Sequence, residues 1–334
     1  MKKIKQVSLA LLAAGLCAAL AGCPGKQAPK GPQDLPEMAK LSFYNADLSI
    51  PIESRMGLMP DKVVDLYRQI DGRPDYAAYM PTPKEKVLFM KYLRLMPPAV
   101  ERIFRERCVG LYFVTNLIGN GFTSWVLDEN GKMYFTMALN PAAFTQSLSA
   151  TLTERESSCF IPGNGWKISV DAGSEYKGMA YAVFHEGAHA VDYIIGITPL
   201  VDPGIPEGFR TKGRLKAEFE TIWAEYGKPL PRYDYKLRDQ LTFYGLGGGP
   251  RIAFKDAAQL YDSLRDSPFI SLYGSKSWAE DFAELSAFRL ITQKMRQPYK
   301  ISLFLKGKLK TEATPASGAA ALRAAGAAEE LGKI

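Results

Sequence analysis

The segment from Tyr176 to Ile195 (YKGMAYAVFHEGAHAVDYII) constrains the fold most strongly. It has helical spacing, contains no proline, and follows Ser174 at the position where an N-cap is expected. Its residues are apolar on nearly every side, which is typical of a helix that is buried all round. The sequence therefore predicts a buried helix over residues 176–196, and the rest of the chain must fold around it.

This helix carries the chain's two histidines, His185 and His189, in the pattern H-E-x-x-H. Four residues turn an α-helix through about 400°, so both imidazoles share one face and can reach a Zn²⁺ ion at about 2.0–2.1 Å. Glu186 can point beside the metal toward a bound water, as a general base does in zinc peptidases. The alternative is two surface histidines on an amphipathic helix. The apolar flanks argue against it, because buried polar side chains need partners.

A catalytic zinc site keeps three protein ligands and one open position, so a third ligand is needed. Some zinc peptidases carry a histidine six residues after the second one, but Ile195 occupies that position after His189. The third ligand must therefore be a carboxylate or one of the two cysteines, Cys108 and Cys159. The segment Tyr273–Arg289 (YGSKSWAEDFAELSAFR) offers the best carboxylates, because they stand among apolar residues on a predicted helix.

The same segment resembles the glutamate helix of the anthrax lethal-factor-like metallopeptidases, with Tyr-Gly, a short spacer and Ala-Glu-x-Phe-Ala-Glu. These enzymes are gluzincins, whose third zinc ligand is a glutamate from a later helix. The resemblance implies that Glu280 is the zinc ligand and that Glu284 orients a ligand histidine through its other ring nitrogen. It also implies that the hydroxyl of Tyr273 faces the oxyanion, and that the fold is zincin-like with two lobes and one catalytic Zn²⁺ ion.

Each of these assignments has an alternative. Ser277 and Glu280 have the spacing of a helix capping box. Glu284 could make an ordinary salt bridge, and Tyr273 could be a core or surface tyrosine.

The connection between His189 and Glu280 departs from the lethal-factor-like pattern, in which it is notably shorter. The extra material, at about 206–266, could form a lid or a specificity wall. The departure also leaves the third ligand open to Asp281 or another carboxylate.

Strand patterns come before the histidine helix and helical patterns after it, which is typical of the α+β class. The strands are expected at 108–115, 122–127, 132–140 and 166–170, and the helices at 61–70, 84–96, 176–195, 213–226, 255–266 and 277–294. One domain over 41–310 would have a sheet lobe at about 100–175 and a helical lobe at 206–310. In a gluzincin the edge strand aligns an extended peptide, and Lys132–Asn140 is the candidate for that strand.

The first residues resemble a bacterial lipoprotein signal. A positively charged start and a short apolar run precede the sequence Leu-Ala-Gly-Cys23. Residues 1–22 are expected to be removed, Cys23 to be lipidated, and the proline-rich residues 23–40 to form a tether. By the same resemblance, Pro24 favours the outer membrane of the bacterial cell envelope.

Charge, cysteines and the C-terminal segment complete the expectations. The formal net charge is +7, including three lysines of the signal, and this mild excess does not argue for nucleic acid as a partner.

In an exported chain Cys108 and Cys159 are expected to form a disulfide, the alternative being two buried free thiols. The basic residues 294–310 predict a solvated face or contact with anionic groups, and the alanine-rich residues 311–334 predict a frayed helix or a disordered tail.

Together these features predict a zinc-dependent peptidase with a protein or peptide substrate, held to a membrane by its N-terminal lipid. One alternative is a non-catalytic envelope interaction lipoprotein that keeps a zinc-binding fold, and another is a zinc hydrolase of a non-peptide bond. The presence of Glu186 speaks against the first alternative, since a decayed enzyme can lose its base while keeping its metal.

Overall fold

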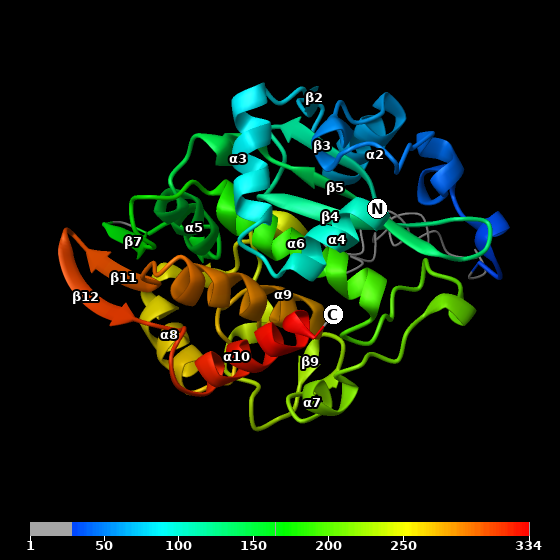
Figure 1. Ribbon diagram of the computed structural model, residues 1–334. Helices are drawn as coiled ribbons and strands as arrows, with labels where there is room; N and C mark the ends of the chain where they lie inside the picture. The colour runs from blue at the N-terminus through cyan, green and yellow to red at the C-terminus, as the bar shows by residue number, and fades with distance from the viewer. Residues whose placement is uncertain (1–28, 164, 334) are drawn as a thin grey trace, which may run out of the picture.

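The computed structural model describes residues 29–163 and 165–333, and it mixes helices and strands (Figure 1). This mixture is compatible with the expected α+β class. The expected signal segment, residues 1–22, and Cys23 lie outside the described residues. In the described part of the chain, no helix combines the length and the apolar character that a membrane crossing requires.

The largest sheet has five strands, three of which lie close to predicted ones. β3 (Cys108–Thr115) pairs in parallel with β5 (Met133–Leu139), and β5 pairs antiparallel with β4 (Gly121–Leu127). Two short strands also pair with β3, namely β1 (Met56–Gly57) and β2 (Ala77–Tyr79). The prediction that 132–140 forms the sheet edge is wrong, because β5 returns between β3 and β4 and leaves β4 at the edge.

Both faces of this sheet are buried, as the aromatic and branched residues of β3 require. Alternate side chains of β3 enter two cores: Phe113 packs in the core shared with α6 (Met179–Ile195), and Val114 packs in the cluster built on α2 (Asp61–Asp71). Two further helices pack on α6, namely α3 (Pro83–Leu93) and α4 (Pro98–Arg107). The histidine helix is therefore enclosed between the sheet and other helices, as predicted.

Part of the expected tether is packed against the domain. Two 3-10 turns, Pro32–Asp34 and Glu37–Ala39, place Leu35 and Ala39 in the cluster around α2. Lys40 then makes a parallel bridge to the end of β4. Residues 32–40 differ from the expected tether because burying their apolar side chains favours a fixed position over a solvated one.

The helical segment around residues 206–294 matches the predictions in part. α8 (Ala257–Arg265) and α9 (Trp278–Arg289) are present, and α9 continues as a π-helical turn over Leu290–Lys294. The predicted helix at 213–226 is mostly wrong, because only α7 (Lys216–Glu220) is helical there. The residues after α7 form the hairpin of β8 (Trp223–Glu225) and β9 (Lys228–Pro229), which buries Trp223 against α9.

The C-terminal residues form regular structure, whereas the sequence predicted a frayed helix or a disordered tail for residues 311–334. β11 (Lys300–Leu305) pairs with β12 (Lys308–Ala313) and with β7 (Trp166–Asp171), which follows the helix α5 (Leu148–Ser157) and the short strand β6 (Phe160–Ile161). β6 pairs with another short strand, β10 (Ile252–Ala253). α10 (Gly318–Gly332) packs beside α9, as the red and orange helices show (Figure 1). The expectation of a disordered tail is therefore wrong here, because small alanine side chains let α10 approach α9 closely and bury one face.

Cys108 and Cys159 are buried free thiols, so the expected disulfide is not formed. Cys108 begins β3, whereas Cys159 follows α5 and places its Sγ 3.8 Å from the carbonyl oxygen of Arg155. Burial raises the pKa of the Cys108 thiol to about 12 and that of Cys159 well above its usual range. Both thiols therefore stay protonated, and neither belongs to the group around the histidines.

Candidate metal centre

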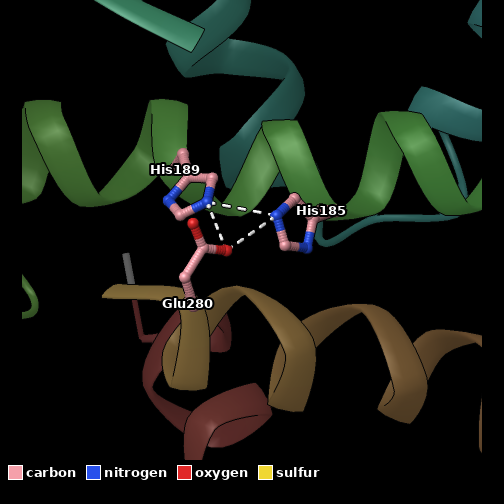
Figure 2. Close-up of side chains that lie close together, drawn as sticks. All are labelled: His185, His189 and Glu280. Atoms are coloured by element: carbon pink, nitrogen blue, oxygen red, sulfur yellow. Dashed lines mark hydrogen bonds and ion pairs between the residues drawn. The ribbon is translucent and has the colours of Figure 1, made fainter. Parts of the chain in front are cut away.

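Helix α6 turns both histidines toward α9 (Figure 2). It begins after Gly178, so the expected cap at Ser174 is wrong, and it ends at Gly196, whose φ of 68° favours glycine. Gly187, between the histidines, allows close packing against the residues that follow α3. A Cβ at Gly187 would lie 2.9 Å from the sulfur of Met96. The lack of a Cβ at Gly187 thus lets α6 pack closely against the chain that follows α3.

Helix α9 presents Glu280 to the two imidazoles from its first turn (Figure 2). The backbone N–H of Glu280 donates to Ser277 Oγ at 3.3 Å, so Ser277 caps the helix while the Glu280 side chain remains free to face the histidines. Only the Ser277 half of the capping box is formed, because the Glu280 side chain does not return to the backbone of Ser277. Asp281 points elsewhere, because Trp223 Nε1 donates to it at 2.9 Å and Arg323 binds both of its oxygens.

Three potential ligand atoms form a compact triangle. His185 Nε2 and His189 Nε2 are 3.2 Å apart, and Glu280 Oε2 lies 3.1 Å from the first and 3.5 Å from the second. In a tetrahedral zinc site with bonds of about 2.0–2.1 Å, the ligand atoms are separated by about 3.3 Å. The spacing fits a single ion, so these three buried residues could hold a metal.

The atoms of this triangle lack other satisfactory partners. Glu280 Oε2 is buried and, despite its approach to His185, makes no hydrogen bond of acceptable geometry within the described residues. Nδ1 of His185 lies 2.9 Å from Glu284 Oε1, and a proton there leaves the Nε2 lone pair directed at the triangle. A bare carboxylate oxygen facing two imidazole nitrogens is costly to bury, and a divalent cation satisfies all three.

The charges around the triangle favour a cation. Burial lowers the pKa of His185, but contacts with Glu280 and Glu284 outweigh it and raise the pKa to about 10. Burial raises the pKa of Glu280, yet the two histidines hold it well below its usual range. Without a metal, His185 therefore tends to carry a second ring proton, and binding of a metal ion would release that proton.

Glu284 is the centre of a buried polar network behind His185. Its Oε1 accepts a hydrogen bond from Tyr181 at 2.7 Å, and its Oε2 accepts from Ser271 at 2.5 Å and from Arg155 Nη1 at 2.7 Å. Burial raises the pKa of Glu284, but Arg155 and His185 lower it to about 2. The salt bridge and the contact with the histidine, which the sequence offered as alternatives, are therefore both present.

Arg155 of α5 lies fully buried between two carboxylates. Its Nη1 pairs with Glu284, and its Nη2 pairs with Glu156 Oε1 at 2.7 Å. Tyr299 accepts from Nη2 at 3.1 Å, and Tyr261 donates to the other oxygen of Glu156. One guanidinium thus faces two buried carboxylates, which leaves negative charge behind the triangle.

Glu186 lies beside the triangle on the side of α6 that faces β4. Thr123 Oγ1 of β4 lies 2.9 Å from Glu186 Oε2. A cavity of about 20 Å³ adjoins Glu186 and His185, and about 10–15 Å³ is enough for one water molecule. Burial raises the pKa of Glu186, which makes this carboxylate a better proton acceptor than an exposed one.

Three tyrosines line the same cavity, namely Tyr181, Tyr244 and Tyr273. The ring of Tyr273 is 5.5 Å from the ring of His185, and burial raises its pKa well above the usual range, so its hydroxyl remains a donor. Tyr244 comes from the long connection before α9 and accepts a hydrogen bond from Asn120 Nδ2 at 2.7 Å. Its positive φ of 57° is costly for tyrosine.

The structure brings together the six residues that the sequence proposed for the site, and it excludes the two cysteines. Sequence reasoning missed five polar residues that surround them: Thr123, Arg155, Tyr181, Tyr244 and Ser271. Tyr181 precedes His185 by one helical turn, so spacing alone could have indicated it. The other four reach the site only through tertiary packing.

Comparison with known proteins identifies no relative. No protein-family model, no curated protein and no solved structure matches this chain. Any function of this chain is therefore inferred from the geometry of its described residues.

We expect the purified protein to bind one equivalent of zinc, and Glu280→Ala to lower zinc affinity more than Glu284→Ala does. The first change removes a ligand, whereas the second frees the orientation of His185, which typically costs about 10- to 100-fold in affinity. Metal analysis after dialysis and zinc titration against a chelating dye measure both effects. Glu106→Ala, an exposed carboxylate of α4, is the matched control, and wild-type zinc affinity in Glu280→Ala would contradict the ligand assignment.

Arg155→Met should lower the free energy of unfolding by about 3–5 kcal/mol, because it leaves two buried carboxylates without their cation. The double variant Arg155→Met/Glu284→Gln should regain part of this loss. Urea unfolding followed by circular dichroism measures both values. Arg105→Met, at an exposed position of α4, should stay within about 0.5 kcal/mol of the wild type. Equal effects at the two arginines would refute the role given to Arg155.

Proposed function

We propose that this chain is a zinc-dependent peptidase that hydrolyses peptide bonds in proteins or peptides. The observation that carries the proposal is the triangle of His185, His189 and Glu280 with a buried carboxylate, Glu186, beside it and space for one water at that carboxylate. A metal site, a base and a water position are the parts that metal-assisted hydrolysis needs.

The proposal includes a zincin-like arrangement, in which the sheet and the segment 206–310 form two lobes on either side of α6. The edge strand β4 supports it, because β4 packs on α6 and its Thr123 contacts Glu186. In the described chain, the one further bridge to β4 is that of Lys40 to Leu127, at the strand's end. An extended peptide paired along the remaining edge would pass beside the base.

Each residue has a distinct part in the proposed reaction. When bound, zinc would supply a Lewis acid that acidifies water and polarises a carbonyl. Glu186 would accept the proton of the water at its carboxylate and later deliver it to the leaving amine. Tyr273 would donate its hydroxyl proton in a hydrogen bond to the oxygen that becomes negative. Glu284, supported by Arg155, would hold His185 in one tautomer and one orientation.

The proposed place of action is the bacterial cell envelope, with the chain anchored through a lipid on Cys23 and directed to the outer membrane. This part of the proposal depends on the sequence of residues 1–24. The two alternative functions predict different outcomes in a peptide-cleavage assay with and without chelator. A non-catalytic lipoprotein would bind zinc without cleaving peptides, and a hydrolase of another bond would cleave only non-peptide substrates.

Glu186→Gln should keep zinc and lose peptidase activity, because the amide preserves the shape of the side chain and cannot accept the proton. We expect kcat/KM to fall by about 10²- to 10⁴-fold. Hydrolysis of a quenched fluorescent peptide library and metal analysis of the same sample measure the two properties. Glu175→Gln, an exposed residue before α6, should behave as the wild type. Full activity in Glu186→Gln would refute the base assignment.

Tyr273→Phe should lower kcat more than it raises KM, because the lost hydrogen bond strengthens only in the transition state. Removal of a single oxyanion donor typically costs about 10²- to 10³-fold in kcat. Steady-state kinetics with one cleaved peptide separates the two constants. Tyr176→Phe, at a partly exposed tyrosine, is the matched control. A change in KM alone would place Tyr273 in substrate binding and not at the oxyanion.

A further inference from the structure

A second cavity, of about 160 Å³, adjoins His189 and shares no lining residue with the cavity beside the base. Ala279, the residue before Glu280, also forms part of its wall, so the cavity is lined by one potential metal ligand and by the neighbour of another. Leu200 and Tyr226 supply apolar surface to the cavity. Nothing in the proposed reaction uses this space.

The loop of residues 197–205, directly after α6, forms one wall of the cavity. Three polar contacts hold it to α6, α9 and β4. The contacts join Thr198 N to Asp192 Oδ1 at 2.6 Å, Trp278 Nε1 to the carbonyl oxygen of Pro199 at 3.0 Å, and Trp125 Nε1 to Asp202 Oδ2 at 2.8 Å. Because the loop is fixed at three points, the cavity exists before any ligand enters and costs little ordering on binding.

The two carboxylates in the wall already have partners. Asp192 accepts bonds from both the N–H and the hydroxyl of Thr198, and Asp202 accepts from Trp125 and from the N–H of Gly204 at 2.8 Å. Their oxygens are thus engaged in holding the loop and are not directed at a cationic ligand. The rest of the lining is mainly aliphatic or aromatic, so the cavity favours an apolar group.

The volume of the cavity indicates which apolar group it can hold. A dry protein cavity of about 150 Å³ is large enough to bind benzene. The cavity beside His189 therefore accommodates a phenyl ring or a branched aliphatic side chain, and a methyl group would leave most of it empty.

We propose that this cavity receives a large apolar side chain, of phenylalanine or leucine size, from the substrate residue next to the scissile bond. The inference rests on the proposed peptidase function and adds the class of substrate to it. Because His189 and Ala279 line the cavity, a side chain bound there would contact one potential metal ligand and the residue that precedes another. Burial of this side chain then positions the neighbouring peptide bond at the base.

Two matched measurements test the pocket. In a peptide series that differs only at the residues flanking one bond, we expect phenylalanine or leucine to raise kcat/KM about 10- to 100-fold over alanine. Ala279→Leu fills the cavity and should abolish this preference while the alanine peptide is still cleaved and zinc content is unchanged. Ala224→Leu, the same change at an exposed position of β8, should keep the preference.

A binding experiment gives a readout that does not depend on activity. The ¹⁹F NMR signal of N-acetyl-4-fluorophenylalaninamide should broaden with the zinc-loaded wild type and with Ala224→Leu, and stay sharp with Ala279→Leu. Broadening without cleavage of any peptide would keep the pocket and refute the peptidase function. Cleavage without apolar preference, or a sharp signal with the wild type, would refute the pocket.

Discussion

The burial of charge between α6 and α9 is the constraint on which the rest of the structure depends. Glu186, Glu280 and Glu284 stand on these two helices with Glu156 behind them, and all four are buried. Each uncompensated carboxylate in such an interior costs several kcal/mol. Arg155 compensates one charge, and a divalent ion at the triangle would compensate two more. Binding of a metal would therefore be coupled to the packing of the two helices.

The need to compensate Glu284 explains why segments far apart in the sequence meet at this carboxylate, which in turn contacts His185. α5 contributes Arg155, the loop before α9 contributes Ser271, and α6 itself contributes Tyr181. All three bind Glu284, so its carboxylate is fixed from three directions before it contacts His185. An imidazole held in this way is preorganised to bind a metal ion and loses little freedom when it does so.

Local patterns were enough to predict several strands and helices and the two histidines of the candidate site, whereas the roles of Glu280, Glu284 and Tyr273 came from the resemblance. β3 has the predicted limits, and both histidines share a helical face because spacing along one helix determines it. The position of β4 at the sheet edge could not be predicted, since strand order depends on which strand pairs with β3. The burial of α10 was missed for a related reason. Its alanines carry a weak hydrophobic signal, and they form a contact only because α9 offers a matching surface.

The long connection between α6 and α9 contributes to both cavities, which its sequence did not predict. Tyr244 from this connection lines the cavity beside the base, whereas Tyr226 and the loop 197–205 line the cavity beside His189. The donors of the triangle limit the chemistry that the site can perform, and the walls limit what can enter it. Because the wall of the cavity beside His189 comes largely from this connection, the choice of substrate would depend on residues outside the H-E-x-x-H and glutamate motifs. Two chains with the same motif could then differ completely in what they bind.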